Sequence, residues 1–175
     1  MNTRILVMLS LLVGIGAVLH AIVPPFFLGM RPDMLLAMMF LGIILFPKAN
    51  YVLILSLATG FVSALTTTVP GGQIANIIDK PITAFAFFAL FLLVRKMGKT
   101  SVTAPVLTAI GTMVSGTVFL SIVLFVIGLM EGSFGILFTT IVLPTAVVNT
   151  IVMAMIYPIT QGIMKRTSLR TTTQP

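Results

Sequence analysis

The chain has 175 residues, of which 58% are hydrophobic and only 7% are charged, and its mean hydropathy is +1.21. Water-soluble domains carry about 25% charged and about 45–50% apolar residues, so this composition excludes a soluble fold and predicts an integral membrane protein. The net charge of +7 would favour nucleic acid as the partner of a soluble protein. Here the basic residues follow the ends of apolar segments, where they set topology and contact anionic headgroups. We therefore expect membrane lipid, and no nucleic acid, as a partner.

The apolar segments are long and nearly uncharged, which favours an all-α membrane protein over a barrel of about ten-residue strands. Six transmembrane helices are expected, at residues 5–23, 32–46, 51–69, 81–94, 104–130 and 134–164. Pro24-Pro25 ends the first helix, because proline and the residue before it leave the helical conformation. A polar loop is expected from Pro70 to Lys80, and kinks at Pro144 and Pro158. Residues 1–164 would then form one domain and residues 165–175 a mobile basic tail.

Basic residues are unevenly divided between the two sides of this arrangement. Arg31 and Lys80 fall on one side, together with the acidic residues Asp33, Asp79 and Glu131. The side that carries both termini holds the other eight: Arg4, Lys48, Arg95, Lys96, Lys99, Lys165, Arg166 and Arg170. Cytoplasmic loops are enriched in lysine and arginine, so both termini are predicted to be cytoplasmic.

Two short segments on the opposite side carry charges between apolar stretches. The first contains Arg31 and Asp33, and the second contains Asp79 and Lys80. Charges in such places are costly unless they face water, a partner or a ligand, so we expect the two segments to roof one small-molecule site. A zwitterionic amino acid would use both charges of a pair, because arginine holds a carboxylate through two parallel bonds and aspartate takes an ammonium group. Either pair fits this role, and the alternative for Arg31 and Asp33 is that they pair with one another or contact lipid headgroups.

Uncharged polar residues add candidate ligand contacts. His20 lies beside the Pro-Pro break and is either a structural hydrogen-bonding group or a substrate contact; it is not a metal site, because no cysteine or second histidine accompanies it. Gln73 and Asn76 belong to the second charged segment. Asn149 lies in an apolar stretch and bonds either a neighbouring helix or an indole or amide in the cavity.

The first helix carries the small residues Ser10, Gly14 and Ala17 on one stripe. Small residues let helices approach closely in lipid, so the stripe packs either within this bundle or against a partner subunit. Catalytic signatures are missing from the sequence, and no cofactor or enzymatic activity is expected. The sequence also lacks a phosphate-binding P-loop, so any ATP that drives transport would be hydrolysed by other chains.

Four blocks of sequence resemble the bacterial tryptophan transport protein (TrpP) family. They are GIGAVLHAIVPP (14–25), MRPDMLL…LFP (30–47), TGFVSALTT (59–67) and GGQIANIIDKP (71–81). The resemblance covers nearly the whole chain and implies a multi-pass protein of the bacterial cytoplasmic membrane that takes up L-tryptophan.

The family in turn is similar to the S components of energy-coupling-factor (ECF) transporters, which are six-helix proteins with an outward-facing site. That similarity implies an ECF transmembrane coupling subunit and two ATPase subunits as partners, with docking on Ser10, Gly14 and Ala17. A self-sufficient secondary tryptophan carrier and a non-transporting membrane assembly or sensor protein remain as alternatives.

Overall fold

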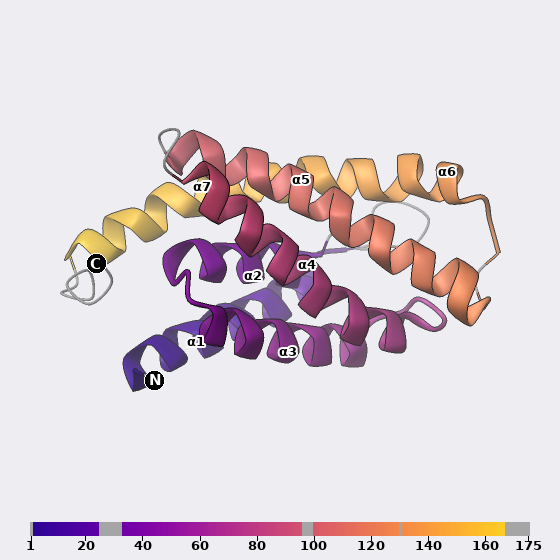
Figure 1. The fold of residues 1–175 in the computed structure, drawn as a ribbon, viewed down its shortest axis with the longest axis horizontal. Coiled ribbons are helices and arrows are strands. Elements are labelled where there is room, and N and C mark those ends of the chain that lie inside the picture. Colours follow the sequence, from indigo (N-terminus) through magenta and orange to yellow (C-terminus); the bar gives the residue numbers. More distant parts are fainter. Residues whose placement is uncertain (1, 25–32, 96–99, 130, 167–175) are drawn as a thin grey trace.

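The computed structural model describes residues 2–24, 33–95, 100–129 and 131–166, which form helices joined by short connections and contain no strand (Figure 1). The expected all-α class is confirmed. The elements are α1 (Thr3–Ile22), α2 (Met34–Leu45), α3 (Ala49–Thr66), α4 (Gly72–Val94), α5 (Thr100–Ser121), the π-helical segment η1 (Ile122–Ile127), α6 (Phe134–Leu137), the π-helical segment η2 (Phe138–Val142) and α7 (Leu143–Arg166). Within the described ranges, five helical spans are long and apolar enough to cross a membrane, and α2 is a shorter apolar helix.

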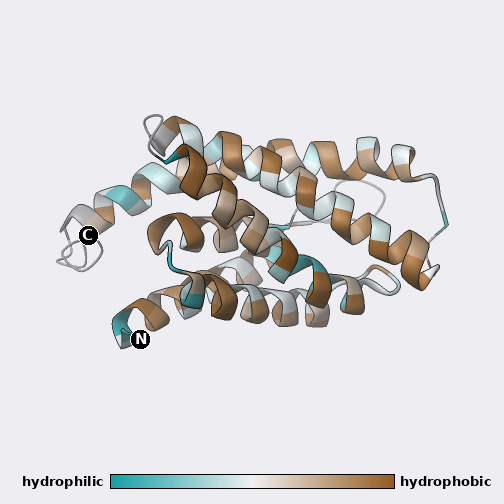
Figure 2. Ribbon diagram, in the orientation of Figure 1, coloured by the Kyte–Doolittle hydropathy of each residue, from teal (hydrophilic) through white to brown (hydrophobic). Residues whose placement is uncertain are grey.

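The two ends of the helical bundle can be told apart by the connections between helices that lie there. The first turn of α1 and the last turn of α7 lie at one end with the α2–α3 connection, whereas the α3–α4 turn lies at the other, beside the end of η1 and the start of α6 (Figure 1). Hydrophobic residues run along each long helix (Figure 2), and many large apolar side chains point outward, among them Leu57, Phe61 and Ile151. An apolar outer surface is what the bilayer requires of a spanning bundle.

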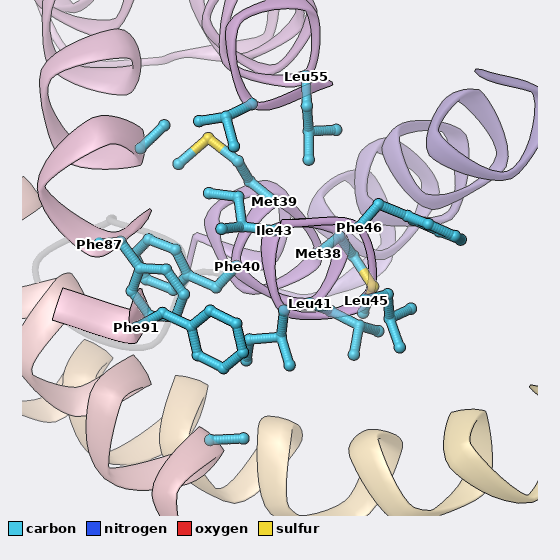
Figure 3. Packing of buried hydrophobic residues seen from close by; sticks show 14 of the residues in the cluster. Met38, Met39, Phe40, Leu41, Ile43, Leu45, Phe46, Leu55, Phe87 and Phe91 are labelled. Atoms are coloured by element: carbon cyan, nitrogen blue, oxygen red, sulfur yellow. The ribbon is translucent and has the colours of Figure 1, made fainter. Parts of the chain in front are cut away.

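The helix α2 lies inside the bundle, and all twelve of its residues are buried. Figure 3 shows its side chains between Leu55 of α3 and two phenylalanines of α4, Phe87 and Phe91. The rings of Phe40 and Phe87 stack with centroids 4.1 Å apart. Twelve residues extend only about 18 Å at 1.5 Å per residue, so α2 is a core helix enclosed by the longer ones.

The polar loop expected between Pro70 and Lys80 is wrong, because α4 begins at Gly72 and continues through Pro81. Gly71 has a φ of 75° and turns the chain after α3. The helix α4 therefore begins directly after this glycine and not at Pro81, where its start was expected. An internal proline removes one backbone donor, and the packing of α4 against its neighbours offsets that loss. Gln73, Asn76, Asp79 and Lys80 therefore lie on a helix.

The last expected helix, 134–164, is continuous through α6, η2 and α7. A wide turn precedes Pro144: the backbone N–H of Leu143 donates to the carbonyl oxygen of Phe138, five residues earlier. Proline has no N–H to donate, and π-helical turns are one way in which a helix accommodates such a gap. The irregularity expected at Pro144 is thus a π-helical segment, η2, whose Ile141 and Val142 line the cavity described next.

Candidate functional site

A cavity of about 130 Å³ lies at the end of the bundle that holds the α3–α4 turn. Its wall contains the last turns of α1 and α3, the residue before α2 and the first turns of α4, together with parts of α5, η2 and α7. The lining residues are His20, Asp33, Leu36, Ser63, Thr66, Thr67, Thr68, Val69, Asn76, Lys80, Thr112, Ser115, Gly116, Phe119, Leu120, Ile141, Val142 and Thr145. Charged and hydroxyl-bearing side chains thus share the cavity with an apolar wall.

A buried ion cluster forms the charged part of the wall. The Nζ atom of Lys80 lies 2.5 Å from Asp33 Oδ2 and 3.0 Å from Asp79 Oδ2, and only 2% of the Lys80 side chain is exposed. Asp79 is fully buried behind the wall; its carboxylate also accepts hydrogen bonds of 2.7 Å from the hydroxyls of Thr83 and Ser115. These donors satisfy Asp79, so its role is to hold the lysine that lines the cavity.

Asp33 links this cluster to the start of α2. Its Oδ1 accepts a 3.0 Å hydrogen bond from the backbone N–H of Leu36, which is the N-cap interaction of α2. Burial raises the pKa of the Asp33 carboxyl, but the charges of Lys80 and His20 and the hydrogen bonds from Lys80 and Leu36 lower it more, so the pKa falls below its ordinary value of 3.8. Asp33 is therefore a carboxylate at neutral pH.

Comparison with known proteins decides the family. A family model described as "Tryptophan transporter TrpP" matches residues 2–165. The chain belongs to the TrpP family. A relative from Bacillus subtilis (strain 168) is 57% identical over 168 residues, 96% of each chain, and is named "Probable tryptophan transport protein". A protein of the same name from Clostridium perfringens (strain 13 / Type A) is 35% identical and covers 96% of this chain and 97% of its own length. No solved structure matches the chain.

Membership of the TrpP family, together with the five apolar spans, makes this chain a multi-pass bacterial membrane transport protein. The expected resemblance to the tryptophan transport protein family is confirmed.

The structure separates the predicted site residues of this TrpP-family chain into three groups. His20, Asp33, Asn76 and Lys80 line the cavity, and Asp79 lies directly behind it. Gln73 is exposed, away from the cavity, and Asn149 is buried, where its Nδ2 donates to Thr112 Oγ1 at 3.3 Å. Arg31 lies outside the described residues.

Several lining residues have no counterpart among the predicted site residues. Hydroxyl side chains form much of the wall: Ser63, Thr66, Thr67, Thr68, Thr112, Ser115 and Thr145. The run Thr66-Thr67-Thr68 falls at the end of the helix expected at 51–69, and three consecutive hydroxyls beside a glycine-rich turn are a recognisable polar signal. Ser115 and Thr112 belong to an apolar helix in which a hydroxyl commonly bonds its own backbone, so the sequence gives no sign of their orientation.

The small-residue stripe of α1 faces outward from the bundle. Ser10 and Gly14 are exposed and Ala17 is half-buried, and a Cβ on Gly14 would meet no atom within 4 Å. A different glycine, Gly16, packs inward, where its Cβ would lie 3.2 Å from the Leu35 backbone. Packing within the bundle is therefore the wrong alternative for Ser10 and Gly14 of this TrpP-family chain.

Proposed function

We propose that the cavity binds L-tryptophan and that the protein takes it up across the bacterial cytoplasmic membrane. The TrpP family and the names of the relatives support this substrate. The observation that carries the proposal is the Asp33–Lys80 ion pair in the cavity wall, which offers opposite charges to a zwitterion. The substrate ammonium would bind Asp33 and its carboxylate would bind Lys80, in the role first considered for Arg31.

The remaining wall suits an indole ring. Phe119, Leu120 and Val142 supply apolar surface, and an aromatic ring buried there gains both area and ring contacts. The Nδ2 of Asn76 donates to the Gly72 carbonyl oxygen at 2.8 Å, so the Asn76 Oδ1 is the end of the amide left for the indole N–H. His20 lies beside Asp33 and completes the polar part of the site.

Calorimetry on the purified protein tests the substrate. We expect heat of binding with tryptophan, weaker binding of indole and tyrosine, and none with riboflavin. Asp33→Asn should weaken tryptophan binding at least about tenfold, because hydrogen bonds to charged groups contribute about 1.5–3 kcal/mol. Gln73→Ala is the matched control, since Gln73 is on the same helix as Lys80 but points away from the cavity. A wild-type protein that binds none of these ligands contradicts the proposal.

We further propose that the protein is the substrate-binding component of an ATP-driven ECF-type importer. One observation supports this: the stripe of Ser10, Gly14 and Ala17 faces outward, where a coupling subunit with two ATPases could dock. Purified protein alone in liposomes should then bind tryptophan without accumulating it. Accumulation driven by an ion gradient, with no ATPase chain present, would instead identify a self-sufficient secondary carrier.

A further inference from the structure

We propose that Ser63 and Thr112 form, together with Lys80, a subsite for the substrate carboxylate. This inference rests on the proposed function and assigns one end of the ligand to one part of the cavity. The three side chains come from three helices, α3, α4 and α5, and all three line the cavity.

Ser63 carries a buried hydroxyl that has no partner in the part of the chain that the structure describes. It is 5% exposed, and its Oγ makes no hydrogen bond to any described residue. Leaving a buried polar group unpaired is unfavourable, so such a group at a cavity wall points to a ligand. Gly60, one turn earlier on α3, lies against α4: its Cβ would be 3.4 Å from Lys80 Cβ. Ser63 therefore lies one helical turn from a residue that packs against Lys80, and both side chains line the same cavity.

Thr112 has a hydroxyl proton that none of the described residues accepts. Its Oγ1 accepts a 3.3 Å hydrogen bond from the Nδ2 of Asn149, and the residue is 2% exposed. Ser115, one turn later on α5, donates to Asp79, which in turn holds Lys80. Thr112 thus lies one helical turn from Ser115, which bonds the ion cluster, and the Thr112 hydroxyl can donate a hydrogen bond to a ligand.

Lys80 supplies the charge for this subsite. An ammonium group has three N–H donors, and two of them are directed to Asp33 and Asp79, which leaves one for a ligand. A carboxylate accepts up to about four hydrogen bonds, so it can take all three donors. An ammonium group would fit this place poorly, because it would meet the positive charge of Lys80 and a Thr112 oxygen already engaged by Asn149.

The test compares tryptophan with tryptamine, which lacks the carboxylate, by competition binding to purified protein. Ser63→Ala and Thr112→Val should each weaken tryptophan binding about tenfold and leave tryptamine binding unchanged, so the selectivity between the two ligands narrows about tenfold. Thr59→Val is the matched control: the Thr59 hydroxyl is also buried and unpaired among the described residues and lies one turn from Ser63, but it does not line the cavity. It should leave both affinities unchanged.

The outcomes are distinguishable. A wild-type protein that binds neither ligand overturns the proposed function and the subsite together. A wild type that binds tryptophan while Ser63→Ala and Thr112→Val bind it equally well overturns the subsite alone. An equal loss of tryptophan and tryptamine binding also overturns it, because the hydroxyls would then support the cavity and not the carboxylate. Ser63→Thr keeps the hydroxyl and should retain selectivity.

Discussion

The ammonium of Lys80 lies 2.5 Å from the carboxylate of Asp33, so α4 is tied to the residue that caps α2. The two residues are separated by 47 positions in the sequence. Asp79 approaches the same ammonium from behind at 3.0 Å. One cation thus holds two carboxylates at the wall of the cavity.

The first prediction concerns that shared cation. Lys80→Met leaves the buried carboxylate of Asp79 and the half-buried carboxylate of Asp33 without their partner, which should lower the free energy of unfolding by about 3 kcal/mol. Chemical unfolding of the purified protein in detergent measures this loss. Adding Asp33→Asn to Lys80→Met should recover part of it, because one of the unpaired charges is removed. Strictly additive losses would contradict a coupled ion pair.

The second prediction concerns pH. Because the pKa of Asp33 is lower in the folded protein than its ordinary value of 3.8, the ionised side chain stabilises the fold fully above that value. The stabilisation should be lost as the pH falls below 3.8 and through the folded-state pKa. Asp33→Asn keeps an N-cap acceptor without the charge. The difference in thermal midpoint between wild type and Asp33→Asn should therefore be constant near neutral pH and shrink in acid; a difference that grows in acid would contradict it.

The third prediction concerns close packing around α2. A Cβ on Gly111 would lie 2.7 Å from ring atoms of both Phe40 and Phe87, and these stacked rings have little room to move. Gly111→Ala should therefore cost about 1–3 kcal/mol of stability through overpacking. Gly14→Ala, where the added carbon meets nothing within 4 Å, should be neutral or stabilise by up to about 1 kcal/mol. Equal thermal midpoints for the two variants would show that the rings adapt freely.

The fourth prediction rests on the proposed ATP-driven coupling. Gly14→Leu places a large side chain on the outward stripe of α1 and should keep a partner helix at a distance. Uptake of tryptophan by cells should fall to background, while tryptophan binding by the purified variant stays at the wild-type value. Ile15→Leu is the control, because Ile15 is exposed on the same helix but off the stripe. Unchanged uptake of tryptophan by cells with Gly14→Leu would contradict docking of a partner subunit on this stripe.

Most helices could be located from the sequence because their apolar lengths are unambiguous. The last one was placed at 134–164, as the structure has it. The start of α4 was missed because Pro81 was treated as a helix boundary, whereas tertiary packing carries the helix through it. Gly71, which adopts a positive φ in the turn, marks the start of α4 better than Pro81 does.

The site was harder to predict for a physical reason: pairing of charges depends on how helices pack. From the sequence, Arg31 with Asp33 and Asp79 with Lys80 were two neighbouring pairs, either of which could contact the substrate. The Asp79–Lys80 pair is present, with 3.0 Å between Lys80 Nζ and Asp79 Oδ2. Lys80 also forms an ion pair with Asp33, which is 47 positions away in the sequence. Which hydroxyls face the cavity depends on helix rotation, and the hydrophobic pattern of a lipid-embedded helix carries little information about that angle.

Because α2 is enclosed by other helices, it does not contact the lipid that surrounds those helices. A spanning helix must match the thickness of the hydrocarbon layer, and a mismatch is relieved by tilting or by deforming the lipid. With all its residues buried by protein, α2 has no lipid boundary to match. Its depth in the bilayer is therefore set by the helices around it, so a change of membrane thickness reaches Asp33 and the cavity only through movements of those helices.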